Sequence, residues 1–301
     1  MASSSAKPGN RYRVRSISLP TRSHPSTLRV EEELNKLKNW EELPLNGGTI
    51  RDGLFGLGEL YKCMEDLLQL PLTQQALVRH QNEKWVNEVF EGSVILLDIC
   101  GFIREIMSQM KECVQSLQSA LRRRRGHGSS IESNVSAYIC SRKKMKKDIV
   151  KFMTALKGID NKSAISPLSD IDHHVLAIVR VLREVNTITI SIFRSLLSFT
   201  SLPVSKLKPS GWSLVSKLMN KGVVVCESEE ENMNEVESVD VALHALCGRR
   251  SCKDAEVERV QMAQKRLEDL EVSIGGLEDG LECMFRRLIQ TRVFLLNILT
   301  H

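Results

Sequence analysis

Apolar residues recur along most of the chain at alternating spacings of three and four residues. This spacing places apolar side chains in one stripe along one face of a helix, and such a face has to be buried. In the segment 83–124 the stripe consists of Leu97, Cys100, Ile103, Met107, Met110, Val114, Leu117 and Leu121. We therefore predict one long amphipathic helix over 83–124.

Two more stripes with this spacing lie further along the chain. The first, within 168–199, consists of Leu168, Ile171, Val175, Ile178, Leu182, Val185, Ile192, Leu196 and Phe199. The second belongs to a helix that begins near residue 254, and it consists of Val260, Ala263, Leu267, Leu270, Ile274, Leu277, Leu281, Met284 and Leu288. Gly275 and Gly276 lie inside this last helix, at a cost of about 1 kcal/mol each relative to alanine. They favour a kink or a close helix crossing at that point.

Shorter helices are predicted between the prolines and glycines that end them. They span 28–43, 51–70, 131–157 and 212–219. No segment alternates apolar and polar residues at the spacing of a strand. The predicted fold class is therefore all-α, an elongated antiparallel bundle of long helices. The same spacing also suits an intermolecular coiled coil, which leaves self-association open.

The N-terminal segment 1–26 differs in composition from the rest of the chain. It is rich in serine, proline and basic residues, and the first acidic residue of the chain is Glu31. We predict a disordered basic tail over 1–26, followed by a helical bundle domain over 27–301. Within that domain, the glutamates of 222–238 predict an acidic, solvated loop.

The tail also bears on where the protein resides. Ser- and Arg-rich segments without acids are typical of organelle transit peptides, so chloroplast import is the alternative to a cytoplasmic location. No apolar run reaches the roughly 18 residues that a membrane-spanning helix requires. We therefore expect a cytoplasmic protein that is either free or peripheral to a membrane.

Composition and motifs argue against an enzyme. The chain has 301 residues, of which 42% are hydrophobic and 26% charged, as in soluble folded proteins. It contains no P-loop, no GxSxG, no HExxH and no Rossmann glycine motif. The spacing of His244, Cys247 and Cys252 fits no standard zinc motif. We therefore predict no catalytic residue, no cofactor and no metal ion.

One candidate site lies in the tail, where the sequence R-S-x-S-x-P spans 15–20. Arg15 stands three residues before Ser18, which suits basophilic kinases, and Pro20 follows two residues after it. A phosphate on Ser18 would add about −1.5 to −2 charges. Because 14-3-3 proteins bind phosphoserine in similar motifs, we expect Ser18 to recruit them. The alternative is a chance match in a Ser/Arg-rich tail.

A second candidate site is a basic block in two parts, one closing the helix predicted over 83–124 and one within the helix predicted over 131–157. The block consists of Arg122, Arg123, Arg124, Arg125, Arg142, Lys143, Lys144, Lys146 and Lys147. In a helical hairpin both parts would form one basic patch at one end of the bundle. Such a patch suits an acidic protein or an anionic membrane, and the plainest alternative is a solvated helix face. Nucleic acid is disfavoured, because Tyr138 is the only aromatic residue nearby.

Six segments together resemble a land-plant family known as domain of unknown function 241, or BPS1-like. They are SISLPTRSHP at 16–25, LYKC at 60–63, LLQLP at 67–71, SRKKMKK at 141–147, LEDGLEC at 277–283 and RRLIQTR at 286–292. The resemblance implies a helical plant protein without enzymatic activity, from a group associated with root and shoot development. The group is distantly similar to BYPASS-type proteins, which restrain a root-derived signal, and to relatives that contact the exocyst.

The residues and the resemblance lead to one functional prediction. We expect a non-enzymatic regulatory or scaffold protein that acts in root and shoot development through protein–protein contacts, with Ser18 as a phospho-switch. The alternative is a peripheral membrane protein that binds anionic lipid or exocyst-type partners through the basic patch. The resemblance supplies no site residues, so the candidate sites rest on the motifs alone.

Overall fold

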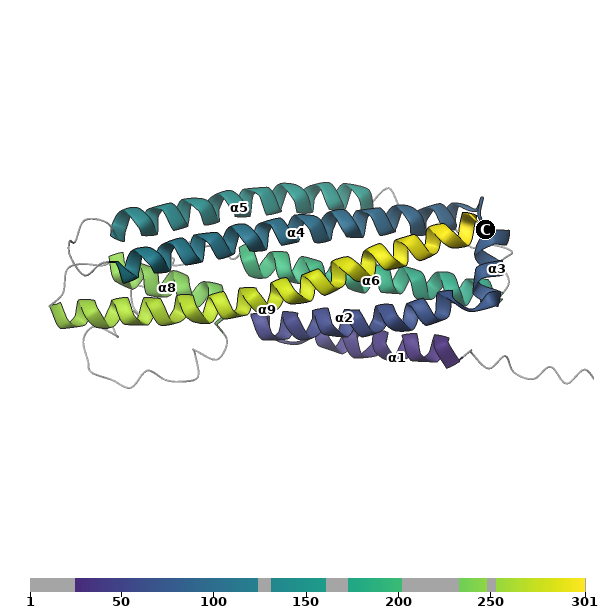
Figure 1. Cartoon of the computed structure of the whole chain (residues 1–301), viewed down its shortest axis with the longest axis horizontal. Coiled ribbons are helices and arrows are strands. Elements are labelled where there is room, and N and C mark those ends of the chain that lie inside the picture. Colours follow the sequence, from purple (N-terminus) through teal and green to yellow (C-terminus); the bar gives the residue numbers. More distant parts are fainter. Residues whose placement is uncertain (1–24, 124–130, 161–172, 202–232, 248–252, 301) are drawn as a thin grey trace, which may run out of the picture.

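A computed structural model describes residues 25–123, 131–160, 173–201, 233–247 and 253–300 of the chain. In these ranges it contains eight helices and no strand, so the all-α prediction is confirmed (Figure 1). The helices are α1 (Pro25–Trp40), α2 (Gly47–Leu68), α3 (Pro71–Arg79), α4 (Lys84–Arg122), α5 (Ile131–Asp160), α6 (His173–Ser201), α8 (Glu235–Cys247) and α9 (Lys253–Thr300). The predicted helix over 212–219 lies outside the described residues.

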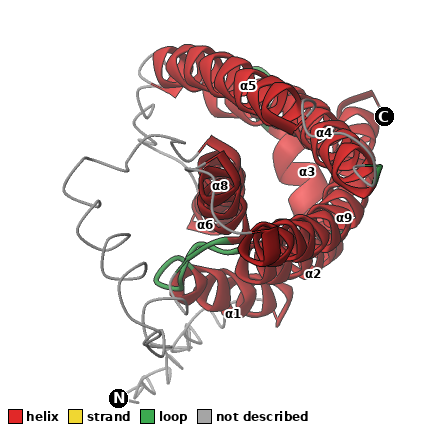
Figure 2. Cartoon of the chain, turned by 90° about the vertical axis from the view of Figure 1, so that its left-hand side faces the viewer, coloured by secondary structure: helices red, strands yellow, loops and turns green. Residues whose placement is uncertain are grey.

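The long helices run along the long axis of the molecule in a curved layer. The spatial order of helices around the curve is α1, α2, α9, α4 and α5 (Figure 2). Helices α6 and α8 lie along the concave side of this layer (Figure 2). Helices α4 and α9 are antiparallel, since Arg104 pairs with Glu282 and Lys111 with Glu278. Helix α2 runs parallel to α9 instead. Every long helix therefore has at least one neighbour along most of its length.

The predicted apolar stripes form the core. The stripe of α9 is buried from Ala263 to Leu288, and the stripe of α4 from Cys100 to Leu121. In α6 the stripe is buried from Val175 to Phe199, whereas Leu168 and Ile171 lie outside the described residues. The 3–4 spacing therefore identified the buried faces of α4, α6 and α9.

Local sequence sets the beginning of α2. The Asn46 side chain accepts a hydrogen bond from the backbone N–H of Thr49 at 2.9 Å, and the Thr49 hydroxyl accepts one from the backbone N–H of Asn46 at 3.2 Å. This reciprocal pair is a capping box, which satisfies two of the amide groups that a helix N-terminus leaves open. It fixes where the chain turns from α1 into α2.

Helices α2 and α9 approach each other closely at one of the two predicted glycines and again one turn later. Helix α9 continues through Gly275 and Gly276. A Cβ atom on Gly275 would meet nothing within 4 Å, whereas one on Gly276 would lie 3.2 Å from Cδ of Arg51 in α2. At Gly280 a Cβ atom would lie 2.9 Å from Cδ1 and 3.1 Å from Cβ of Leu54. Gly276 and Gly280 therefore both lie where α2 approaches α9 closely, and the contact at Gly280 was not predicted from the sequence.

The prediction of an acidic loop over 222–238 is wrong at its C-terminal end. Helix α8 begins at Glu235, and the Asn234 side chain caps it by accepting a hydrogen bond from the backbone N–H of Glu237 at 2.9 Å. Val236 is fully buried and Glu235 is half-buried, so this stretch packs against the bundle. Residues 222–232 lie outside the described residues.

Candidate functional site

The structure separates the two parts of the predicted basic patch. Arg122 and Arg123 lie at the end of α4, whereas Arg142 comes eleven residues after the start of α5. At 1.5 Å per residue, that places Arg142 about 16 Å along α5 from its beginning. The two parts therefore do not meet at one end of the hairpin. Arg124 and Arg125 lie outside the described residues.

Arg142 is not part of any surface. Arg142 is only 3% exposed. Its guanidinium forms an ion pair with Asp240 of α8 and donates a hydrogen bond to the Tyr138 hydroxyl. The sequence carried a signal for this position that the basic run obscured. Val135, Tyr138, Arg142, Met145 and Ile149 are spaced by three and four residues, and all are buried. Arg142 therefore occupies an apolar stripe position and is removed from the candidate patch.

The basic residues that remain accessible lie on the outward side of α5, and we call them the α5 lysine face: Lys143, Lys144, Lys147 and Lys151. Lys151 is 3.9 Å from Asp148. No carboxylate of the described ranges lies within ion-pair distance of the other three lysines. Lys146 is half-buried beside them. Helix α5 lies at the end of the curved layer (Figure 2), and the four lysines of this face are exposed.

At the end of α4, the charge of Arg122 is partly matched within the molecule. Its guanidinium is 3.2 Å from the Glu268 carboxylate of α9, and both side chains are more than half exposed. Arg123 donates a hydrogen bond to the backbone carbonyl of Ser119 at 3.1 Å. The contacts of these two arginines therefore stabilise the C-terminal end of α4. Cations at this end also interact favourably with the helix dipole.

The remaining sequence candidates fall largely outside the described residues. Arg15, Ser18 and Pro20 belong to 1–24, and Cys252 belongs to 248–252. Within the described ranges no group of three histidine, cysteine or acidic side chains is placed to hold a metal ion. Nor is any helix in those ranges both long and apolar enough to cross a bilayer.

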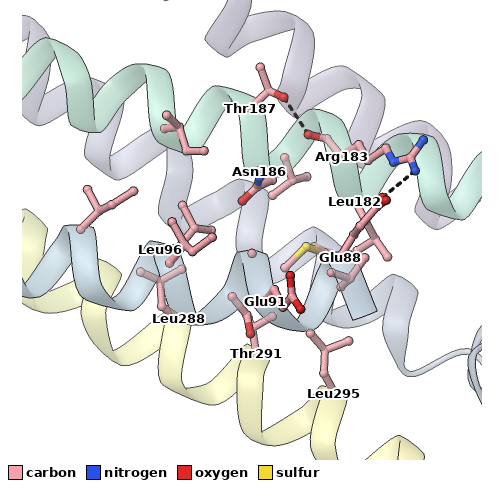
Figure 3. Close-up of a pocket in the computed structure, with 18 of the residues that line it drawn as sticks. Glu88, Glu91, Leu96, Leu182, Arg183, Asn186, Thr187, Leu288, Thr291 and Leu295 are labelled. Carbon is pink, nitrogen blue, oxygen red and sulfur yellow. Dashed lines mark hydrogen bonds and ion pairs between the residues drawn. The ribbon is translucent and has the colours of Figure 1, made fainter. Parts of the chain in front are cut away.

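A cavity that the sequence analysis did not anticipate lies where α2, α4, α6 and α9 meet (Figure 3). Its volume is about 330 Å³. Aliphatic side chains such as Leu96, Leu182 and Leu288 form most of its wall, and Glu88 and Arg183 form an ion pair of 2.8 Å beside it. No local sequence pattern indicates this cavity, because it depends on how four helices pack against one another.

Comparison with known protein families shows which family the chain belongs to. The family model described as Protein BPS1 matches residues 53–298. The chain belongs to the BPS1 family. The matched range begins within α2 and ends near the end of α9, so it includes the α5 lysine face and the cavity. It does not include the Ser18 motif of the tail. No curated protein and no solved structure matched the chain.

Membership of the BPS1 family agrees with the resemblance drawn from the six sequence segments. Five of these segments lie inside the matched range, and the segment 16–25 lies before it. In the structure, LYKC and LLQLP belong to α2 and the start of α3, and SRKKMKK belongs to α5. The segment SRKKMKK thus contains both the buried Arg142 and three lysines of the α5 lysine face.

Proposed function

We propose that this BPS1-family chain is a non-enzymatic regulatory protein of plant development that binds acidic segments of partner proteins through the α5 lysine face. The observation that carries the proposal is the concentration of exposed lysines on one side of an outer helix. Lys143, Lys144 and Lys147 have no acidic neighbour within ion-pair distance in the described ranges. Family membership supports the developmental part of the proposal.

The spacing of the lysines makes the face costly without a partner. Lys143 and Lys147 stand four residues apart, and Lys144 and Lys147 stand three apart. Like charges at these helical spacings each destabilise a helix by about 0.2–0.5 kcal/mol. An acidic segment laid along α5 would relieve this repulsion. Its charges would also act together, because neighbouring lysines lie within the Debye length of about 8 Å at physiological salt.

The tail is the proposed regulatory element. Phosphorylated Ser18 would present a phosphate in a motif that suits 14-3-3 proteins, and Arg15 would direct the kinase. The motif itself supports this part of the proposal. In extracts from root tips, 14-3-3 proteins should be captured by the intact chain and lost with Ser18→Ala. Equal capture by both proteins would remove the switch from the proposal and leave the α5 lysine face.

The α5 proposal is tested by charge reversal in the full chain. A variant with Lys143→Glu, Lys144→Glu and Lys147→Glu is compared with a control that carries Arg79→Glu, Lys84→Glu and Lys265→Glu, which are exposed on α3, α4 and α9. Both variants change the net charge equally. Proximity labelling in root tips should show partners that the α5 variant loses and the control keeps. Equal partner sets for the two variants contradict the proposal.

A second candidate is binding to an anionic membrane through the same face. The observation that favours it is Val150, which is 53% exposed on α5 beside the lysines. An exposed apolar side chain among cations suits an interface with anionic lipid. Flotation with vesicles of phosphatidylcholine alone or with added phosphatidylserine separates the two candidates. If the wild type floats only with vesicles that contain phosphatidylserine, and the α5 variant does not float with them, the membrane is favoured over a protein partner.

A further inference from the structure

We propose that the cavity between α2, α4, α6 and α9 is a binding site for a neutral amphipathic small molecule, with an apolar body and one hydroxyl or carbonyl group. Its volume of about 330 Å³ falls within the range in which small-molecule sites occur. Four helices contribute to its wall, so the site belongs to the packed part of the fold (Figure 3).

The wall fits an apolar body. Aliphatic and thioether side chains from all four helices line the cavity, among them Met64, Leu96, Ile99, Leu182, Leu288 and Leu295. All six of these residues are buried from solvent. Filling such a space with an apolar molecule removes apolar surface from water and restores dispersion contacts that the wall otherwise lacks.

One polar atom in the wall points to a ligand with a hydrogen-bonding group. The Thr291 residue is 5% exposed, and its hydroxyl is buried without a hydrogen-bond partner in the described ranges. Buried hydroxyl groups are normally satisfied, since leaving one unpaired costs about 1–3 kcal/mol. Asn186, half-buried on α6, adds a side-chain amide to the same wall. A ligand hydroxyl or carbonyl would supply the missing partner.

The charges around the cavity favour a neutral ligand. Glu91 lines it with an exposed side chain, and Glu88 lines it as the ion-pair partner of Arg183. The guanidinium of Arg183 is already neutralised by Glu88 at 2.8 Å. Arg194, the other cation of the wall, is engaged as well. A ligand carboxylate or phosphate would therefore gain no free cation from the described wall.

Gly92 forms part of the α4 wall of the cavity, and because glycine has no side chain, that part of the cavity stays open. The three atoms nearest to a Cβ atom on this residue would all belong to the Asn186 side chain, at 3.6–3.8 Å, which is ordinary contact. Alanine therefore fits at position 92 without strain, and a longer side chain there would enter the cavity. The residue offers a matched pair of variants, since Gly92→Leu fills the site and Gly92→Ala does not.

The test uses the full chain and the fluorophore 6-propionyl-2-dimethylaminonaphthalene, which is neutral and has one carbonyl group. The wild type and Gly92→Ala should bind one equivalent with a blue shift of the emission, and Gly92→Leu should lose that binding. Thr291→Val replaces the hydroxyl by a methyl of similar shape and should weaken binding roughly 3–10-fold, the worth of one hydrogen bond. Thermal unfolding of each variant shows that it is folded.

Three outcomes overturn the proposal. Binding by Gly92→Leu equal to that of the wild type places the fluorophore elsewhere. Tighter and Gly92-dependent binding of the anion 8-anilinonaphthalene-1-sulfonate contradicts a neutral ligand. Absence of saturable binding by the wild type rejects the site. If Gly92→Leu does not fold, Thr291→Val decides, because unchanged affinity in that variant contradicts the assigned hydrogen bond. The triple α5 variant should bind normally, which separates this site from the proposed function.

Discussion

Arg142 of α5 and Asp240 of α8 form an ion pair, with 3.4 Å between Nη1 and Oδ1 and side chains 2% and 9% exposed. The guanidinium also donates a hydrogen bond to the Tyr138 hydroxyl at 3.2 Å. Burial raises the pKa of Asp240, and the charge of Arg142 opposes that rise. The pair therefore joins two helices that are far apart in the sequence, and neither charge is available to a partner.

Removing one member of this pair should be costly. Arg142→Met leaves the Asp240 carboxylate buried without its cation, and breaking a buried pair in this way typically costs about 3–5 kcal/mol. We expect a loss of that order in the free energy of unfolding, measured by urea denaturation. Lys143→Met is the control, because the neighbouring lysine is exposed and its loss should change the free energy by less than about 0.5 kcal/mol.

The double variant Arg142→Met with Asp240→Leu sharpens this test. Buried ion pairs replaced by apolar residues of similar volume are often neutral in stability, because no charge remains to be desolvated. The double variant should therefore regain most of the loss of Arg142→Met. Equal stability of Arg142→Met and the wild type would show that the pair contributes nothing to the joint between α5 and α8.

The approach of α2 and α9 predicts opposite effects for two glycines of one helix. Gly280→Ala would place a Cβ atom 2.9 Å from Leu54 Cδ1, and such overpacking costs about 1–3 kcal/mol. Gly275→Ala meets no atom within 4 Å and should gain about 0.5–1 kcal/mol from the higher helix propensity of alanine. Guanidinium denaturation of both variants measures this. Stabilisation by both would contradict a close crossing at Gly280.

Glu65 predicts a dependence of stability on pH. One carboxylate oxygen is 3.2 Å from Nη1 of Arg287, and the other is buried without a partner in the described ranges. Burial raises the pKa of Glu65 above its ordinary value of 4.5, and Arg287 opposes the rise. Between 4.5 and the folded pKa, the folded state keeps a proton that the unfolded state has lost. Stability from this group is therefore present below pH 4.5 and is lost as the pH rises through the folded pKa.

Glu65→Gln isolates that contribution, because glutamine does not titrate. The free energy of unfolding of the wild type should fall relative to the variant as the pH rises from about 4 through the folded pKa. Urea denaturation at half-unit steps of pH measures the difference between the two proteins. A difference that is constant across this range would show that Glu65 has the same pKa in the folded and unfolded states.

The sequence was sufficient for the long helices and for the buried faces of α4, α6 and α9, but not for α8 or for the sites. Apolar spacing is a property of one helix, so the stripes of α4, α6 and α9 were predicted from local residues alone. The burial of Arg142 depends on Asp240, 98 residues away, and on which face of α5 meets α8. The cavity depends on side chains of four helices, and neither Gly92 nor Thr291 stands out in its own segment.

Glu235 connects three helices through one carboxylate. Its oxygens accept hydrogen bonds from the backbone N–H of Gly47 at 3.1 and 3.2 Å and from the Ser273 hydroxyl at 2.7 Å. Gly47 is the first residue of α2, so the carboxylate also lies at the positive end of that helix dipole. The residue therefore anchors the start of α8 to the start of α2 and to α9.

Glu235→Ala should lower the free energy of unfolding by about 2–3 kcal/mol, since hydrogen bonds to a charged group each contribute about 1.5–3 kcal/mol. Glu237→Ala, an exposed acid two residues later, serves as the control and should change little. Glu235→Gln keeps one acceptor oxygen but loses the charge, so its smaller loss should shrink further as salt screens the helix dipole. Denaturation at 0.05 and 1 M NaCl measures both parts. A loss in Glu235→Gln that does not change with salt would assign the contact to hydrogen bonding alone, without a contribution from the charge.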